Sequence, residues 1–196
     1  GMHFNKSDAM LEAIKLSAKS YTLKFDIEDI MDHYLCGTVK AGSAQQVSKV
    51  FFGGEEEITI EESIKDDSGK PLLFKTGIRQ GQIKTRKVKK VINVAGLELN
   101  PNIVKASMTK RVGIYTVGDD VLKSICEQYP ASGGVLAAKL MEYRGLTKDI
   151  KTYYVGYSEL VWSHDSCIHP QFNHCVTATG RLSHSSPNLG NVSHKK

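Results

Sequence analysis

The 196-residue chain has few of the features that mark secreted or membrane proteins. Its four cysteines, Cys36, Cys126, Cys167 and Cys175, form no closely spaced CxxC pair, and its N-terminus carries no apolar signal segment. No hydrophobic run approaches the length that a bilayer-spanning helix needs. We therefore expect a cytoplasmic protein with reduced thiols and no role in a membrane.

Acidic residues are missing from the C-terminal part of the chain. Asp165 is the last carboxylate, so residues 166–196 offer no general acid or base and no ligand for the magnesium sites of phosphoryl transfer. The segment 176–192 instead combines one arginine, Arg181, with hydroxyl side chains and two asparagines. A guanidinium among neutral donors suits phosphate, sugar or the minor-groove edge of base pairs. The alternative is a loop whose asparagines close turns on the backbone.

What is present is the composition of an ordinary globular protein. Hydrophobic residues make up 40 % of the chain, enough for a core, and the net charge of +5 leans toward a polyanionic partner. In the first predicted helix the apolar residues Leu11, Ile14, Ala18, Tyr21 and Phe25 fall on one stripe. Capping-box signals start the second helix at Ser43 and the third at Thr116. The predicted helices cover residues 6–35, 43–52, 116–129 and 136–154.

The middle of the chain, from Glu55 to Val112, has β-branched runs broken by turns and predicts a small strand-rich insertion. Residues 55–67 are acidic, whereas residues 79–111 are basic with Glu98 as their only acid. Two interpretations stay open: a hairpin whose charge blocks pair with each other, or a surface that contacts phosphates. The cations at issue include Lys84, Arg86, Lys87, Lys89 and Lys90. Further on, short strands are expected at 160–162 and 167–169 around a turn at 164–166.

Two C-terminal motifs resemble a known family. Residues 177–183 read TATGRLS and residues 187–191 read PNLGN, which resembles the TxTGRLSS...PNLQN motif of family A DNA polymerases, the bacterial DNA polymerase I type. Residues 142–153 resemble the family's YRxLxK...TY helix, residues 165–169 its DGRIH hairpin, and residues 42–51 its SPKQLxxxLF helix. The resemblance covers both ends of the chain and leaves the insertion outside.

The resemblance implies an α+β fold with two parts. Residues 1–156 would form a helical thumb with the β-rich insertion at about 55–112, and residues 157–196 would form the first short antiparallel strands of a palm. The metal-binding aspartate, the finger helix and the His-Asp-Glu motif of the family lie beyond Lys196. We therefore expect Mg²⁺ and the deoxynucleotide to bind only in the complete enzyme, and this chain by itself to be inactive.

The resemblance also implies residue roles toward primer–template DNA. Arg181 would reach the minor groove at the primer terminus, Asn188 and Asn191 would contact the duplex nearby, and the basic thumb residues would meet its backbone. The expected DNA contacts are Arg144, Lys148, Thr179, Arg181, Asn188 and Asn191. The insertion's basic residues would extend this grip. Gly190 departs from the family's glutamine, which removes an amide from the expected interface.

Two rival interpretations remain. Five histidines lie near the C-terminus with Cys167 and Cys175, which are ligand types for zinc, but their spacing fits structural zinc sites poorly. Those histidines are His164, His169, His174, His184 and His194. The second rival is a DNA-binding or partner-binding module that never polymerises.

Overall fold

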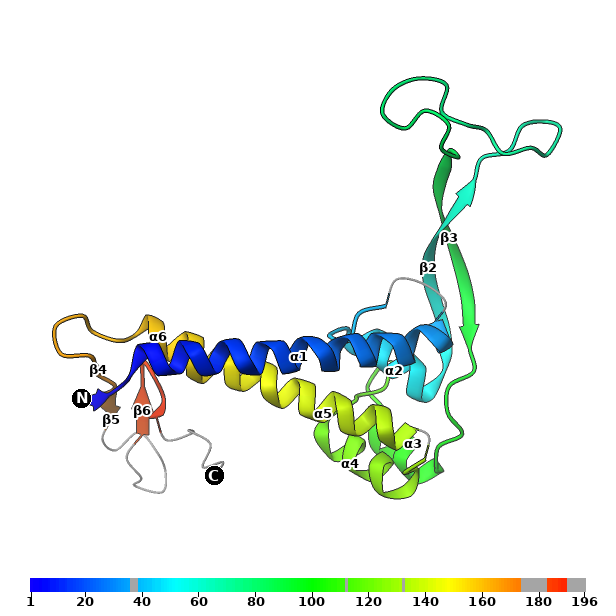
Figure 1. Cartoon of the computed structure of the whole chain (residues 1–196). Helices are drawn as coiled ribbons and strands as arrows, with labels where there is room; N and C mark the ends of the chain where they lie inside the picture. The colour runs from blue at the N-terminus through cyan, green and yellow to red at the C-terminus, as the bar shows by residue number, and fades with distance from the viewer. Residues whose placement is uncertain (36–38, 112, 132, 174–182, 190–196) are drawn as a thin grey trace. The chain divides into compact units, whose positions relative to one another are not determined.

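A computed structural model describes residues 1–35, 39–111, 113–131, 133–173 and 183–189 (Figure 1). The chain divides into two compact units, one formed by residues 1–24 with 141–196 and the other by residues 25–140. Helices combine with small antiparallel two-stranded sheets, which confirms the predicted α+β class. None of the helices in the described ranges has the length and apolar character of a membrane-spanning segment.

Unit 25–140 is built mainly from helices that surround one core. The helices that contribute to it are α1 (Lys6–Leu35), α2 (Ala44–Phe52), α3 (Pro101–Ser107), α4 (Asp119–Gln128) and α5 (Gly133–Asp149). Their most buried side chains include Ile27 and Met31 of α1, Phe51 of α2, Ile125 of α4 and Leu140 of α5, all 0 % exposed. Lys139 of α5 also forms an ion pair with Asp26 of α1.

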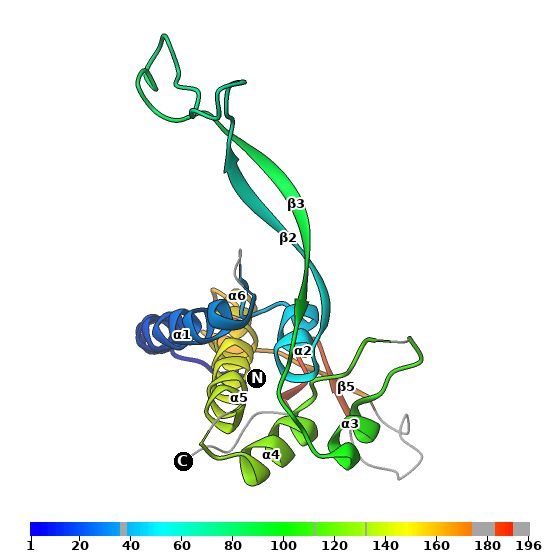
Figure 2. The same ribbon diagram turned by 90° about the vertical axis from the view of Figure 1, so that its right-hand side faces the viewer.

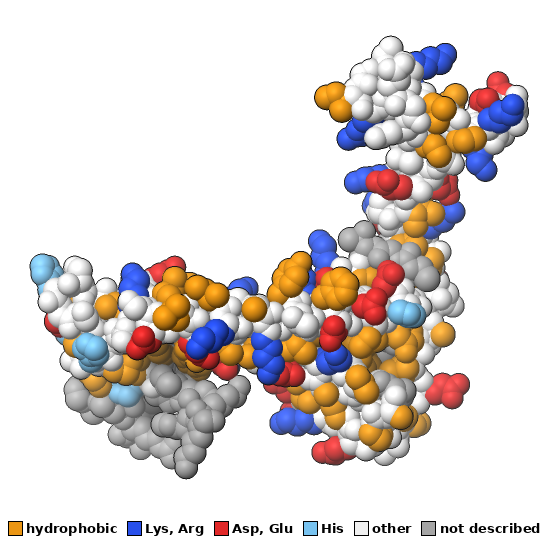
Figure 3. Space-filling model, in the orientation of Figure 1, with side chains coloured by type: hydrophobic (Ala, Val, Ile, Leu, Met, Phe, Trp, Pro, Cys, Tyr) orange, Lys and Arg blue, Asp and Glu red, His pale blue; other side chains and the backbone are white. Residues whose placement is uncertain are grey.

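The apolar stripe predicted for α1 does not face the core. Leu11, Ile14, Tyr21 and Phe25 are 59 %, 67 %, 73 % and 67 % exposed. Hydrophobic side chains accordingly lie on the visible surface of α1 (Figure 3). A second row with the same helical spacing is buried instead: Leu23, Ile27, Met31 and Leu35. Periodicity therefore predicted the helix correctly, but the residues buried in the core belong to another row than the stripe, because more than one row of apolar residues fits a helical period.

The helix starts were predicted with mixed success. Ser43 caps α2 as expected, since its side chain accepts a hydrogen bond from the backbone N–H of Gln46. The helix expected at Thr116 begins three residues later, at Asp119, with Gly118 as its N-cap. Residues just before it are joined to the end of α3 instead, since Tyr115 forms a β-bridge with Met108 and the Thr116 N–H donates to the carbonyl of Ser107.

The strand-rich insertion is one long hairpin followed by a helix. β2 (Gly54–Ser63) and β3 (Thr85–Val94) pair antiparallel, with Ile60 opposite Val88, and Figure 2 shows the pair as a twisted ribbon. Helix α3 was not predicted in this region. It begins at Pro101, where the side chain of Asn100 accepts from the N–H of Asn102, which is an N-cap followed by proline at the first helical position.

The other unit carries the short strands. β1 (Met2–His3) pairs with β4 (Cys167–Ile168), and β5 (Gln171–Asn173) pairs with β6 (Ser183–Ser185). The strand expected at residues 160–162 is not formed. Instead the Trp162 N–H donates to the Cys167 carbonyl as part of a turn, and the N-terminal β1 takes the place of the partner strand. Before this turn, α5 continues into a π-helical segment (Ile150–Val155) and then α6 (Gly156–Glu159).

Candidate nucleic-acid interface

A pocket in unit 1–24 with 141–196 brings together two stretches about thirty residues apart in the sequence. It has a volume of about 460 Å³ and lies between the end of α5, the π-helical segment, α6 and the segment that follows β6. Its lining includes Lys148 and Asn188, for which the sequence predicts DNA contact from two different motifs. The described residues that line it are Lys148, Thr152, Tyr153, Tyr157, Pro187 and Asn188.

Tyr157 holds the two stretches together. Its ring is buried, with 5 % of its surface exposed, and its hydroxyl donates to the backbone carbonyl of Asn188 at 3.2 Å. Tyr153, one turn earlier, meets the Tyr157 ring edge to face at 5.6 Å, and Phe4 meets it at 6.3 Å. Burial, and secondarily Tyr153, raise the pKa of Tyr157.

The described lining of the pocket contains one cation and no acid. Lys148 is exposed and supplies a positive charge, while Thr152 and Asn188 supply neutral hydrogen-bonding groups. Arg144 lies one turn before Lys148 on the same face of α5 and is half-buried, but it does not line the pocket. A cation beside neutral donors suits a phosphodiester backbone, and these lining residues supply no carboxylate for acid–base chemistry.

Sequence reasoning missed Tyr157 as a residue of this site. Tyr153 and Tyr157 are four apart, which places both on one face of a helical segment and is the signal that could have found the pair. Three other expected contacts, Thr179, Arg181 and Asn191, lie outside the described residues.

The turn that resembles the DGRIH hairpin is organised around Asp165. Its carboxylate accepts the N–H of Cys167 at 2.9 Å and is joined to Nε2 of His169 by a hydrogen bond of 2.7 Å. The Cys167 N–H, and then His169, hold the pKa of Asp165 below its usual value. The last carboxylate of the sequence is therefore occupied in fixing a turn.

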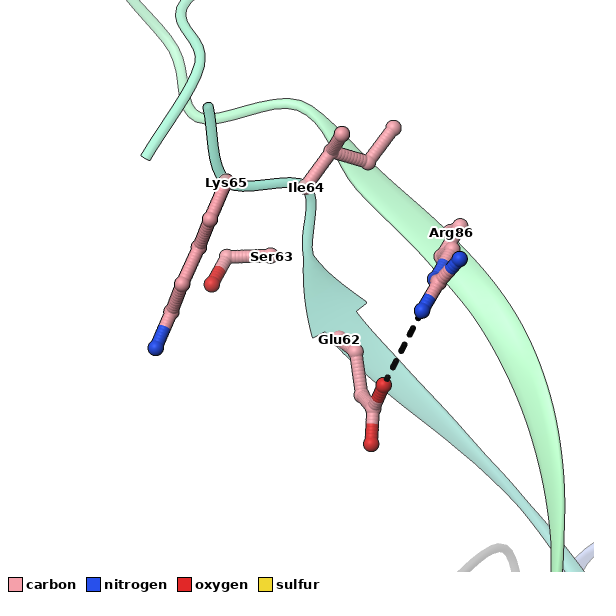
Figure 4. Close-up of a pocket in the computed structure, with 5 residues that line it drawn as sticks. All are labelled: Glu62, Ser63, Ile64, Lys65 and Arg86. Carbon is pink, nitrogen blue, oxygen red and sulfur yellow. Dashed lines mark ion pairs between the residues drawn. The ribbon is translucent and has the colours of Figure 1, made fainter. Parts of the chain in front are cut away.

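The charged blocks of the β2–β3 hairpin pair with each other. Lys89 lies 2.6 Å from Glu57, and Lys90 lies 2.7 Å from Glu62. Glu62 also lies 3.8 Å from Arg86, the ion pair drawn in Figure 4. Lys90 is the main cause that lowers the pKa of Glu62, followed by Arg86 and Lys65. These ion pairs favour the first of the two interpretations of the insertion.

The predicted DNA contact of the hairpin cations is not tested by these ion pairs. Lys84 lies over the ring of Phe74, 5.5 Å from its centroid, and Lys87 is exposed on β3. DNA contact by Lys84, Arg86, Lys87, Lys89 and Lys90 stays a prediction.

Metal ligands do not gather in the described part of the chain. No group of three His, Cys, Asp or Glu side chains lies there in a position to hold an ion. His174, Cys175 and His194, which the zinc interpretation would use, fall outside the described ranges.

Comparison with known proteins identifies relatives of this fold. The model of DNA polymerase family A matches residues 80–196. The thermostable DNA polymerase I of Thermus aquaticus is 36 % identical over 84 residues, 43 % of this chain and 10 % of its own length. DNA polymerase I of Bacillus subtilis is 27 % identical over 132 residues, 67 % of this chain and 13 % of its own.

A solved structure matches the whole chain. It is the POL domain of Pol1 from M. smegmatis in complex with DNA primer-template and dNTP, with a TM-score of 0.55 and 20 % sequence identity, and the match covers 100 % of this chain and 24 % of that one. The likeness shows a shared fold. The chain spans only about a tenth of the length of the two DNA polymerase I relatives described above.

Proposed function

Because the chain belongs to DNA polymerase family A, we propose that it is the part of a DNA-directed DNA polymerase that grips primer–template duplex during nucleotide addition in DNA replication or repair. It would comprise the thumb, residues 1–156 with the hairpin as an insertion, and the start of the palm, residues 157–196. Its contacts would be to the DNA backbone and the minor groove. The M. smegmatis relative was solved with primer-template DNA, which supports the choice of ligand.

One observation carries the proposal. Lys148 and Asn188 come from separate motifs, are each predicted to contact DNA, and line the same pocket. Two residues that are predicted separately to contact DNA thus line one pocket, and this agreement favours a common ligand. Duplex DNA fits because Lys148 can neutralise a phosphate while Asn188 offers an amide to sugar or base edges.

The remaining contacts follow from the same arrangement. Arg144 would meet the backbone near Lys148, and Arg181 would reach the minor groove at the primer end, with Thr179 and Asn191 beside it. Minor-groove acceptors are placed similarly in every correct base pair. Such contacts would test the shape of the primer end without reading its sequence.

Magnesium chemistry belongs to the complete enzyme in this proposal. The described residues offer no carboxylate cluster for it, and no acid follows Asp165. The complete enzyme would use two Mg²⁺ ions to join a primer 3′-hydroxyl to a deoxynucleotide. This chain supplies binding and orientation, and the 196-residue protein alone should not extend a primer.

The direct test is the affinity of the chain for a fluorescent primer–template duplex, followed by anisotropy at several salt concentrations. We expect Lys148→Gln to weaken binding about equally for all sequences and to reduce the salt slope by about 1, the value for one lost phosphate contact. Lys15→Gln, on exposed α1 residue Lys15, is the matched control. An unchanged slope for Lys148→Gln would count against the pocket as the DNA site.

A second test uses the longer polymerase that contains this chain. There Arg181→Ala should slow primer extension more than it weakens DNA binding, because its contact positions the primer end. An equal or greater loss of binding would contradict that role.

A further inference from the structure

The charge of the β2–β3 hairpin is distributed unevenly along its length. Near the base, Glu56 and Glu57 are paired with Lys49 and Lys89. Toward the far end of the hairpin, cations outnumber acids. The apex, defined as residues 64–84, has two acids, Asp66 and Asp67, against five cations: Lys65, Lys70, Lys75, Arg79 and Lys84.

The excess of cations over acids begins in the strands just before the apex. One carboxylate, Glu62, lies 2.7 Å from Lys90 and 3.8 Å from Arg86. Lys65 lines the same hollow, which has a volume of about 580 Å³ and is shown in Figure 4. Three cations therefore gather around one acid, so this side of the ribbon is positive where it meets the apex.

The apex cations, all of which the structure describes, form no ion pair with the two apex acids. Asp66 is engaged by its own turn, where its carboxylate accepts the N–H groups of Ser68 at 3.0 Å and Lys70 at 2.9 Å. In the described part of the chain no apex cation forms an ion pair, and Lys70, Lys75 and Arg79 are exposed. These three cations are available to an external polyanion.

The apex also holds an apolar side chain away from the protein. Hydrogen bonds from Gly81 N–H to the Phe74 carbonyl and from Phe74 N–H to the Gln82 carbonyl close the loop 74–82. Within it the Gln80 N–H donates to the Gly77 carbonyl, which places Ile78 and Arg79 at the two corners of a turn. Gly77, which precedes the two corner residues, has a φ of 87°, a backbone conformation that favours glycine. Ile78 is fully exposed, at 104 %.

We infer that the apex of the hairpin is a second DNA-binding site, in which Lys70, Lys75 and Arg79 contact phosphates and Ile78 enters the minor groove. Apolar wedges flanked by basic residues are a recurrent way to bind and bend duplex DNA. Four of the five apex cations are lysines, which the cores of protein interfaces avoid, so DNA fits better than a protein partner. The choice of DNA as the ligand rests on the proposed function. The inference that the apex binds a polyanion does not.

The test compares two variants with equal loss of charge. The apex variant carries Lys70→Gln, Lys75→Gln and Arg79→Gln, and the strand variant carries Lys87→Gln, Lys89→Gln and Lys90→Gln. Each is titrated into a fluorescent duplex at several salt concentrations, after its melting curve has shown that it folds. We expect the salt slope to become shallower by about 2 to 3 for the apex variant, as for three lost phosphate contacts, and by less for the strand variant, because Lys89 and Lys90 are already paired with Glu57 and Glu62.

Ile78→Ser tests the apolar contact separately. It should lower affinity and reduce bending, measured by energy transfer between the two ends of the duplex, while the salt slope stays unchanged. Wild-type bending and affinity in Ile78→Ser would overturn the minor-groove contact.

The other outcomes separate this inference from the proposed function. Equal slopes for the apex and strand variants would mean that only overall charge matters, and would overturn the apex site. The apex site is also overturned if Lys148→Gln weakens binding and the apex variant does not, but the proposed function then stands. If the apex variant weakens binding and Lys148→Gln does not, the apex site stands and the pocket loses its support as a DNA site. A wild-type chain that binds no duplex at low salt would overturn both.

Discussion

The Tyr157 hydroxyl donates a hydrogen bond to the Asn188 backbone carbonyl at 3.2 Å, and this bond joins the helical and C-terminal sides of the candidate DNA pocket. Tyr157 is buried, with 5 % of its surface exposed, so most of the residue that makes this bond is shielded from water. Asn188 is itself exposed. The buried ring thus fixes the backbone of an exposed residue that lines the pocket.

Tyr157→Phe removes that donor and keeps the ring. We expect the free energy of unfolding to fall by about 0.5 to 1.5 kcal/mol, the usual contribution of one hydrogen bond, measured by denaturant titration. Duplex affinity should fall as well, because Asn188 loses its fixed position. Tyr21→Phe, on an exposed tyrosine of α1, is the control and should change neither quantity. Unaltered stability and affinity in Tyr157→Phe would show that the bond does not organise the pocket.

Asp165 predicts a pH dependence of stability. Its pKa in the folded protein is lowered from 3.8, so the ionised carboxylate stabilises the fold above that value, and this contribution disappears as the pH falls through the folded pKa. Wild type should therefore be more stable than Asp165→Asn at neutral pH, and the difference should shrink as the medium becomes more acidic than pH 3.8. Urea titrations across the acidic range would measure it. A difference that is independent of pH would refute the assignment.

Gly96 is the position where the base of the hairpin passes closest to α2. Its φ is 71°, and a Cβ there would lie 2.3 Å from the backbone nitrogen of Gly53. Gly96→Ala should destabilise the protein by about 1 to 3 kcal/mol or more, since backbone strain and overlap add. Gly42→Ala is the matched control, because nothing lies within 4 Å of its added Cβ. Equal thermal stability of the two variants would contradict the close approach.

Local signals in the sequence were sufficient for several elements and insufficient for others. The N-cap at Ser43 was predictable because both of its partners lie within one turn. The buried face of α1 was not, because the rows containing Ile14 and Ile27 have the same period and only tertiary packing distinguishes them. Helix α3 is short, and its asparagine and proline start signals lay inside a region whose composition is typical of strands.

At the candidate site, too, the sequence predicted some features and not others. Lys148 and Asn188 were predicted from motifs, but their meeting in one pocket depends on Tyr157, whose bond spans 31 residues. The pairing of β1 with β4 joins residues near opposite ends of the chain. Periodicity and capping rules describe neighbours in sequence and contain no information on such long-range pairs.

The most direct test of DNA binding at the pocket is amide hydrogen exchange of the 196-residue chain, with and without saturating primer–template duplex. It reports on the backbone of both sides of the pocket at once. We predict slower exchange in peptides that cover residues 144–157 and 183–189 when DNA is bound. Unchanged exchange in both segments when the protein is saturated with DNA would contradict the claim that this pocket grips the duplex.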